Sequence, residues 1–283
     1  MTASTERFEG PSRTRSSLSA LSWMQAFFSR FAVQVRVVRA LMIRDIMAQY
    51  GRQNLGFLWL IGEPMALIVG VIILWSLMKG STTHGVSVVA FTLTGYSMLT
   101  LWRHLLTRGG NGLSRHATLL FHQNIRLLDI LIAQILMEMI SIFLSFLVCY
   151  LLLFLFGYVE PANDNLLLVS GWLLMSLFGA GMTLLLSGLT EMSKPLKRLL
   201  QPILYFTLPL TGAFAMCAWL PERARDVILV FPMVHAMELF RAGFMGERFT
   251  FYYNIWYLFA WGIGTFFLGL LVMKRAERHL HIG

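Results

Sequence analysis

Glu63 and Pro64 stand side by side in one of the most apolar stretches of the chain. A carboxylate and a residue without a backbone N–H are both unfavourable in a helix that crosses lipid. The run before them is basic and amphipathic, with Arg44 and Arg52 and no acidic residue after Asp45. Two interpretations fit this pattern equally well. Either the carboxylate of a kinked helix faces a polar passage or a basic group near the cytoplasm, or it caps a broken helix.

Other charged residues stand in apolar surroundings further along the chain. Glu138 is flanked by Met137 and Met139, and a lone carboxylate in such a segment is expected to face the interior of a helix bundle. We interpret Glu138 as a hydrogen-bond partner between helices in preference to a substrate contact. Glu238 and Arg241 are three residues apart, a spacing that lets them pair on one face of a helix.

Aromatic residues make up 13% of the chain, and many lie within apolar segments. Their faces could stack on sugar rings along a path, but membrane proteins also place Trp and Tyr at lipid interfaces. For any single residue, interface or core packing is the expected role. The aromatic residues in question are Tyr96, Trp102, Trp172, Tyr205, Phe206, Phe214 and Trp219.

No residues have the spacing of a catalytic or metal site. Cys149 and Cys217 lack a CxxC partner and are interpreted as small buried hydrophobes, so no metal, cofactor or disulfide framework is expected. The absence of paired carboxylates and of a nucleophile motif argues against an enzyme. A GxxxxGK[ST] motif is also missing, so this chain is not expected to hydrolyse ATP itself. The histidines are scattered, at His84, His104, His116, His122, His235, His279 and His281.

The composition indicates an all-α integral membrane protein. Of the 283 residues, 57% are hydrophobic and only 13% are charged, and the mean hydropathy is +0.67. Soluble domains are about 25% charged. The net charge of +9 is carried by short loops, where it reports orientation, and nucleic-acid binding is not expected.

Six apolar segments are long enough to cross a hydrocarbon core of about 30 Å. We predict membrane-spanning helices over residues 57–78, 88–107, 127–156, 165–190, 199–220 and 255–273. Together they form one transmembrane domain, residues 57–273, and a tail follows at 274–283. Of the Lys and Arg residues, 18 fall on one side of this arrangement and 5 on the other, which predicts that both termini are cytoplasmic.

The segment before the first predicted span has two parts. Residues 1–20 are rich in Ser, Thr, Arg and Gly and are predicted to be disordered. Residues 21–56 alternate apolar and basic positions at helical spacing, which is typical of an amphipathic helix in the membrane interface. A solvated helix packed on a partner is the alternative.

Two connecting stretches are expected to contain short helices. Residues 220–254 are too polar to cross the membrane and too apolar for a free loop, so they predict two re-entrant helices split near Pro232. On the cytoplasmic side, Gly109, Gly110 and Gly112 are expected to end the preceding helix. A short amphipathic helix over residues 114–122 should follow and suits docking to a soluble partner, although an interfacial helix without a partner is also possible.

These motifs, taken in order, resemble a known family. The run YGRQNLGFLWLIGEPM resembles the start of the first span in permeases of the type-2 ABC exporter superfamily, within the capsular polysaccharide and O-antigen export branch. LLFHQNIRLLDILIAQILME is similar to that family's tract from coupling helix into span three, and FPMVHAMELFRAGFMG resembles its periplasmic re-entrant segment. Together they cover most of the chain. His122 stands where family members often have proline.

The resemblance implies a homodimer of six-span subunits in a bacterial inner membrane, bound to two separate ABC ATPase subunits that carry ATP and Mg. It would export a lipid-linked polysaccharide to the periplasm and work with periplasmic and outer-membrane capsule export proteins. Its coupling helix carries over to 114–122 and its gate to 231–244. The ATPase contacts expected there are Ser114, Arg115, His116, Leu119, Phe121 and His122. The expected gate residues are Pro232, His235, Glu238 and Arg241.

On this reading, basic groups near the cytoplasmic mouth meet an anionic substrate, and aromatic residues line its path. The expected path residues are Arg44, Arg52, Glu63, Tyr96, Trp102, Tyr205, Phe206 and Trp219. The alternatives are export of O-antigen or teichoic-type glycans, a drug or lipid efflux permease on the same scaffold, and a membrane assembly scaffold that transports nothing.

Overall fold

The computed structural model describes residues 15–50, 56–115 and 127–280, and almost all of its regular structure is helical. The α-helices are α1 Arg15–Tyr50, α2 Gly56–Lys79, α3 Val88–Arg115, α5 Leu127–Leu155, α6 Asn165–Met192, α7 Lys194–Thr207, α8 Glu222–Ile228, α9 Pro232–Met245 and α10 Ile255–Leu280. Strands β1 Thr82–Thr83 and β2 Val86–Ser87 pair in an antiparallel hairpin. The described ranges also contain three 3-10 turns: η1 Pro209–Thr211, η2 Cys217–Trp219 and η3 Gly246–Arg248.

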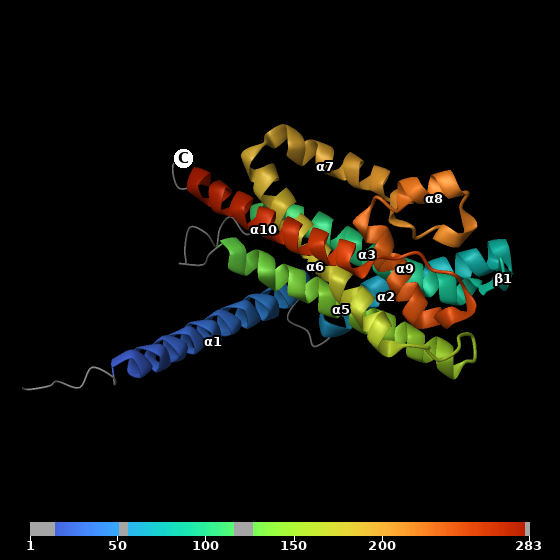
Figure 1. Cartoon of the computed structure of the whole chain (residues 1–283), viewed down its shortest axis with the longest axis horizontal. Coiled ribbons are helices and arrows are strands. Elements are labelled where there is room, and N and C mark those ends of the chain that lie inside the picture. Colours follow the sequence, from blue (N-terminus) through green and yellow to red (C-terminus); the bar gives the residue numbers. More distant parts are fainter. Residues whose placement is uncertain (1–14, 51–55, 116–126, 281–283) are drawn as a thin grey trace, which may run out of the picture.

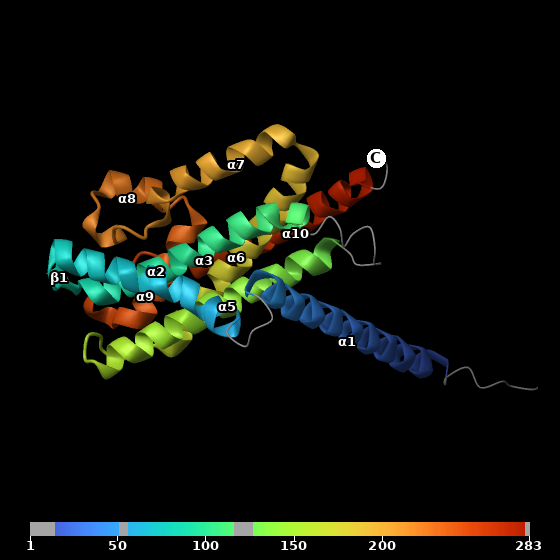
Figure 2. The same ribbon diagram turned by 180° about the vertical axis from the view of Figure 1, so that it is seen from behind.

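The long helices form an elongated bundle, and different helices lie at its two ends (Figure 1). The α1 helix projects from the end that also holds the C-terminal part of α10, while α8, α9 and the hairpin lie at the opposite end. The α7 helix runs along the outside of the bundle between these ends (Figure 2). The α6 and α10 helices pack closely because Gly181 leaves room for the backbone of Phe266, whose nitrogen would lie 2.5 Å from an added Cβ.

Among the described residues, four helices are long and apolar enough to cross a membrane: Leu58–Lys79, Leu127–Leu155, Asn165–Met192 and Ile255–Arg278. They match the predicted spans 57–78, 127–156, 165–190 and 255–273. The number rises to five if α8 and α9, which meet at 107°, are counted as one broken span. The described part of the chain is therefore a mostly helical membrane protein with four or five apolar helices.

The α3 helix begins at the predicted residue, Val88, but is more polar than these four. Its polar side chains are buried among neighbouring helices, including Thr92, Thr94, Ser97 and Thr100. The predicted end of this helix is wrong, because α3 continues through Gly109, Gly110 and Gly112 to Arg115. Each glycine costs a helix only about 1 kcal/mol relative to alanine, so three of them do not have to end it.

The predicted span over residues 199–220 is wrong as a continuous helix. The α7 helix ends at Thr207 and is followed by the turns η1 and η2. Pro209 has no N–H to continue the helix, and Gly212 adopts a left-handed φ of 75°. At 1.5 Å per residue, α7 is about 21 Å long, which is too short to cross a bilayer alone.

Both ends of the chain are more helical than predicted. The α1 helix begins at Arg15, inside the segment expected to be disordered, and α10 continues to Leu280 through most of the expected tail. Residues 21–50 of the predicted interfacial segment are helical and belong to α1, which packs on α5 through Val38 and Leu41.

Candidate functional site

The segment predicted to be re-entrant, residues 220–254, contains the best-defined polar site in the described chain. As predicted, it consists of two short helices that separate near Pro232. Pro232 occupies the first turn of α9, where backbone N–H groups have no helical acceptor, so the helix loses no hydrogen bond to the proline. All residues of α9 from Pro232 to Phe244 are buried, so its charged residues lie inside the protein.

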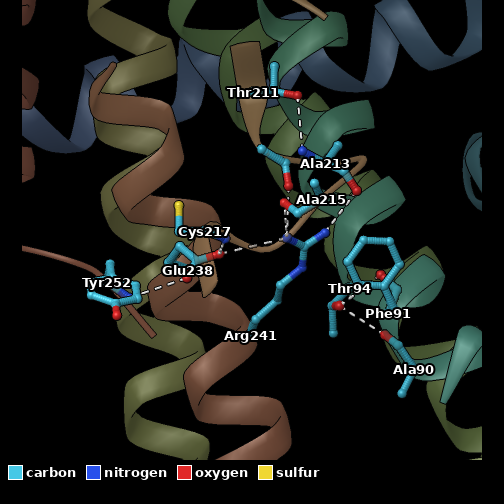
Figure 3. Close-up of polar contacts among 11 residues, drawn as sticks. Ala90, Phe91, Thr94, Thr211, Ala213, Ala215, Cys217, Glu238, Arg241 and Tyr252 are labelled. Atoms are coloured by element: carbon cyan, nitrogen blue, oxygen red, sulfur yellow. Dashed lines mark hydrogen bonds and ion pairs between the residues drawn. The ribbon is translucent and has the colours of Figure 1, made fainter. Parts of the chain in front are cut away.

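Arg241 of α9 holds the segment that follows α7. Its side chain is 0% exposed. Nη1 donates to the carbonyl of Gly212 at 2.8 Å, and Nη2 donates to that of Ala213 at 2.8 Å. The guanidinium also lies over the ring of Phe91 of α3, 4.3 Å from its centroid. One planar fork thus joins three parts of the fold, as Figure 3 shows.

Glu238, one turn before Arg241 on the same face of α9, completes this arrangement. One carboxylate oxygen accepts the N–H of Cys217 at 3.2 Å, and the other accepts the N–H of Tyr252 at 3.2 Å (Figure 3). The predicted pairing with Arg241 is confirmed, with an N–O separation of 3.9 Å. We call Glu238 and Arg241 the α9 clamp, because together they fix the segment 212–217 and the start of the α10 connection.

His235 fixes the turn between α8 and α9. Its Nδ1 accepts the N–H of Asn254 at 3.1 Å, so the ring proton is on Nε2, which donates to the carbonyl of Leu229 at 2.8 Å. The ring also packs edge-on against Tyr257 of α10, with centroids 5.0 Å apart. All four predicted gate residues therefore lie on α9, and three of them bind neighbouring segments through polar groups.

An aromatic cluster adjoins the α9 clamp and contains two of the predicted path residues. Trp219 packs on His84 and on Phe91, at centroid distances of 4.7 and 5.0 Å. Tyr96 contacts Trp75 and Phe214 at 6.2 Å in each case. Since Phe91 also lies under Arg241, the cluster and the clamp form one continuous unit at the end of the bundle that holds α8 and α9.

The chain is similar to several curated proteins along almost its whole length, although no family model matches it. It is 33% identical to the capsule polysaccharide export inner-membrane protein CtrC of Neisseria meningitidis serogroup A, over 89% of this chain and 96% of the relative. The chain belongs to the family of capsule polysaccharide export inner-membrane proteins. BexB of Haemophilus influenzae is 29% identical over 89% of this chain and 95% of that protein. The polysialic acid transport protein KpsM of Escherichia coli is 25% identical over 88% and 96%.

Family membership and the apolar helices identify a multi-pass inner-membrane protein, and the relatives are named for export. The described residues contain no group of three His, Cys, Asp or Glu side chains able to hold a metal ion. What the α9 clamp can do chemically is hold segments together through buried charge-assisted hydrogen bonds.

Glu63 and Pro64 lie within one uninterrupted helix, α2, which contradicts the alternative in which Glu63 caps a broken helix. Pro64 is buried, whereas Glu63 is exposed on the surface of the single chain. A proline deprives the carbonyl four residues earlier of its helical donor, and here that carbonyl belongs to Leu60. It accepts a hydrogen bond from the Ser141 hydroxyl of α5 instead.

The other predicted path residues are not gathered in one place. Arg44 pairs with the buried Asp45 at 2.7 Å. Trp102 is buried and stacked on Phe178, with centroids 5.3 Å apart, as a core residue would be. Tyr205 and Phe206 lie on α7 and are exposed.

The predicted ATPase contacts fall largely outside the described residues, as does Arg52. His116, Leu119, Phe121 and His122 are among them. Ser114 and Arg115 form the last residues of α3, so the prediction that a new helix begins at Ser114 is wrong.

Sequence reasoning missed several partners that the fold supplies. The interhelical role predicted for Glu138 is confirmed, but its partner His104, 2.9 Å away through Nδ1, was not identified. Gly95 was also missed, although it lies against Arg241 with room for no side chain. No local signal marks these residues, because each depends on which helices become neighbours.

Proposed function

We propose that this chain is the transmembrane subunit of an ATP-driven exporter that moves lipid-linked capsular polysaccharide from the cytoplasm to the periplasm. The observation that carries the proposal is the 33% identity to a capsule polysaccharide export protein across 89% of the chain. ATP hydrolysis would belong to a separate subunit, since these residues contain no P-loop.

The proposed topology has six crossings and both termini in the cytoplasm. Four crossings are the apolar helices, a fifth is α3, and the sixth is α7 with the turns that follow it. The burial of the α3 polar side chains supports a place for this helix inside the membrane. The position of α1 and of the C-terminal part of α10 at the same end of the bundle supports the common side of the termini (Figure 1).

The proposed assembly is a homodimer with two ATPase subunits docked at residues 114–122, together with periplasmic and outer-membrane export proteins. An exposed apolar face on α7 supports the presence of further protein or lipid contacts, because Tyr205 and Phe206 are 63% and 79% exposed. In this scheme the aromatic cluster contacts sugar rings, and α8 and α9 close the outer end of the path.

Deletion of the gene tests the function. We expect loss of surface polysaccharide and its accumulation inside the cell, both reversed by the wild-type gene but not by a copy lacking α9. Normal surface polysaccharide with new sensitivity to apolar drugs would contradict the proposal and favour efflux. Co-purification of an ATPase with the tagged chain tests the proposed assembly separately.

A further inference from the structure

A groove lies between α3 and α7, with a cavity volume of about 30 Å³ that is partly open to the surroundings. It is lined by Arg103, Thr107, Gln201, Leu204, Tyr205 and Leu208. None of these six residues is acidic, so the charge presented to the groove is positive. The two leucines supply an apolar wall beside this polar set.

Arg103 of α3 is the cationic residue that lines this groove. It lies about 22 Å from Val88 at 1.5 Å per residue, near the end of the predicted span 88–107, and is exposed on the surface of the single chain. Within the described ranges its guanidinium makes no hydrogen bond or ion pair, whereas the Arg44 guanidinium pairs with Asp45 and that of Arg241 binds backbone carbonyls. A charged side chain on a membrane-spanning helix is favourable where it faces a polar cavity, a ligand or the membrane interface.

The remaining polar groups suit an oxygen-rich anion. Gln201 offers an amide N–H, and Tyr205 offers a phenolic hydroxyl from the next turn of α7. The Thr107 hydroxyl donates to the Arg103 carbonyl at 2.7 Å. A guanidinium fork with two further donors matches a phosphate, and the leucines beside it match an acyl chain.

We infer that the groove between α3 and α7 binds the phosphate group of a lipid. The same chemistry has two possible sources, a membrane phospholipid or the phosphate linkage of the exported glycolipid. The second source rests on the function proposed above, and the first does not.

Lipid binding to the purified full chain tests the site. The probes are dioleoyl phosphatidic acid and dioleoylglycerol, which differ only in the phosphate, and bound lipid is measured by native mass spectrometry. We expect wild-type protein to prefer the phosphatidic acid, and Arg103→Gln to weaken its binding by about tenfold or more, since hydrogen bonds to charged groups are the strong ones. Arg103→Lys should lose less because it keeps the charge, and Tyr205→Phe should weaken binding by about threefold.

Arg198→Gln is the matched control, since Arg198 is exposed on α7 and does not line the groove. It should change affinity by less than about twofold, as expected of a surface charge. Unchanged binding in Arg103→Gln, or an equal loss in Arg198→Gln, overturns the inference. Size-exclusion profiles verify that each variant is folded.

Surface polysaccharide in cells carrying Arg103→Gln then identifies the source. Loss of both phosphatidic acid binding and export supports a site for the exported glycolipid, while loss of binding with normal export supports a site for membrane phospholipid. Because binding is measured without export, failure of the proposed function would leave this result standing.

Discussion

Ser141 of α5 donates its hydroxyl hydrogen to the backbone carbonyl of Leu60 of α2. That carbonyl is the one that Pro64, four residues later, cannot serve. One turn further along α5, Ser145 donates to the carbonyl of Ile61 at 2.8 Å. A neighbouring helix therefore satisfies the polar group that proline exposes, which allows α2 to remain one helix in lipid.

Replacing Ser141 with alanine should destabilise the protein by about 1 kcal/mol, because the Leu60 carbonyl loses its donor. In a Pro64→Ala background the loss should be smaller, since the alanine restores the helical N–H. Thermal unfolding of the two single variants and the double variant in detergent measures this coupling.

Ser176→Ala provides the comparison. Ser176 is equally buried, but its hydroxyl donates at 2.8 Å to the carbonyl of Trp172 in its own helix. That carbonyl keeps its helical donor, so we expect a loss of less than about 0.5 kcal/mol. An equal loss for Ser141→Ala with and without Pro64 would contradict the role given to Ser141.

Breaking the α9 clamp should have a much larger effect. Arg241→Met leaves the carboxylate of Glu238 and three carbonyls, of Gly212, Ala213 and Ala215, without their cationic partner, and we expect a destabilisation of about 3–5 kcal/mol. Replacing both residues, as Glu238→Gln with Arg241→Met, should cost less than the sum of the two single changes. Unfolding in detergent of the four proteins gives the coupling directly.

The exposed pair of Arg248 and Glu160 is a control for loss of an ion pair alone. Its N–O distance of 2.7 Å is shorter than that of the α9 clamp, but the two side chains are 70% and 74% exposed. Arg248→Met should therefore cost less than about 1 kcal/mol. Similar losses for Arg248→Met and Arg241→Met would show that burial does not decide the strength of the clamp.

The sequence was sufficient for the elements whose signals are local. The spans that became α2, α5, α6 and α10 are long apolar runs, and their predicted starts agree with the structure within one residue. The two helices around Pro232 were also predictable. Proline favours the first turn of a helix, and the surrounding segment is too polar for a span and too apolar for a free loop.

Features that depend on neighbours were not predictable. The end of α7 was predicted incorrectly. The apolar run over residues 199–220 indicated one continuous helix, whereas Pro209 and the left-handed Gly212 follow the end of α7 at Thr207. Gly109 and Gly110 are the opposite case. They were predicted to end the helix, but both are helical within α3. The ion pair between Arg44 and Asp45 was not predicted, because Arg44 was interpreted as a contact to an anionic substrate.

The close approach of α3 to Arg241 should make Gly95 intolerant of a side chain. A Cβ there would lie 2.7 Å from Nη2 of Arg241 and 3.0 Å from the carbonyl oxygen of Ala213. Gly95→Ala should therefore destabilise the protein by about 1–3 kcal/mol, as overpacking of a core does. Melting temperatures of the purified variants in detergent measure the effect.

Gly70→Ala is the natural control for this substitution, since no atom lies within 4 Å of a Cβ added there. Alanine should stabilise α2 by about 0.5–1 kcal/mol through its better helix propensity. If both alanine variants shift the melting temperature in the same direction, the contact between Gly95 and Arg241 does not limit this position.

His235 should matter more through its two nitrogens than through its ring. His235→Phe keeps an aromatic contact with Tyr257 but leaves the N–H of Asn254 and the carbonyl of Leu229 without partners, so we expect a loss of about 2–4 kcal/mol. Tyr257→Phe removes only the hydroxyl that donates to the carbonyl of Val230 at 2.8 Å on the exposed side, and should cost about 1 kcal/mol or less. Thermal unfolding compares the two variants, and hydrogen exchange at Asn254 reports the lost bond itself. Equal losses, or unchanged protection at Asn254 in His235→Phe, would mean that ring packing and not hydrogen bonding holds the turn between α8 and α9.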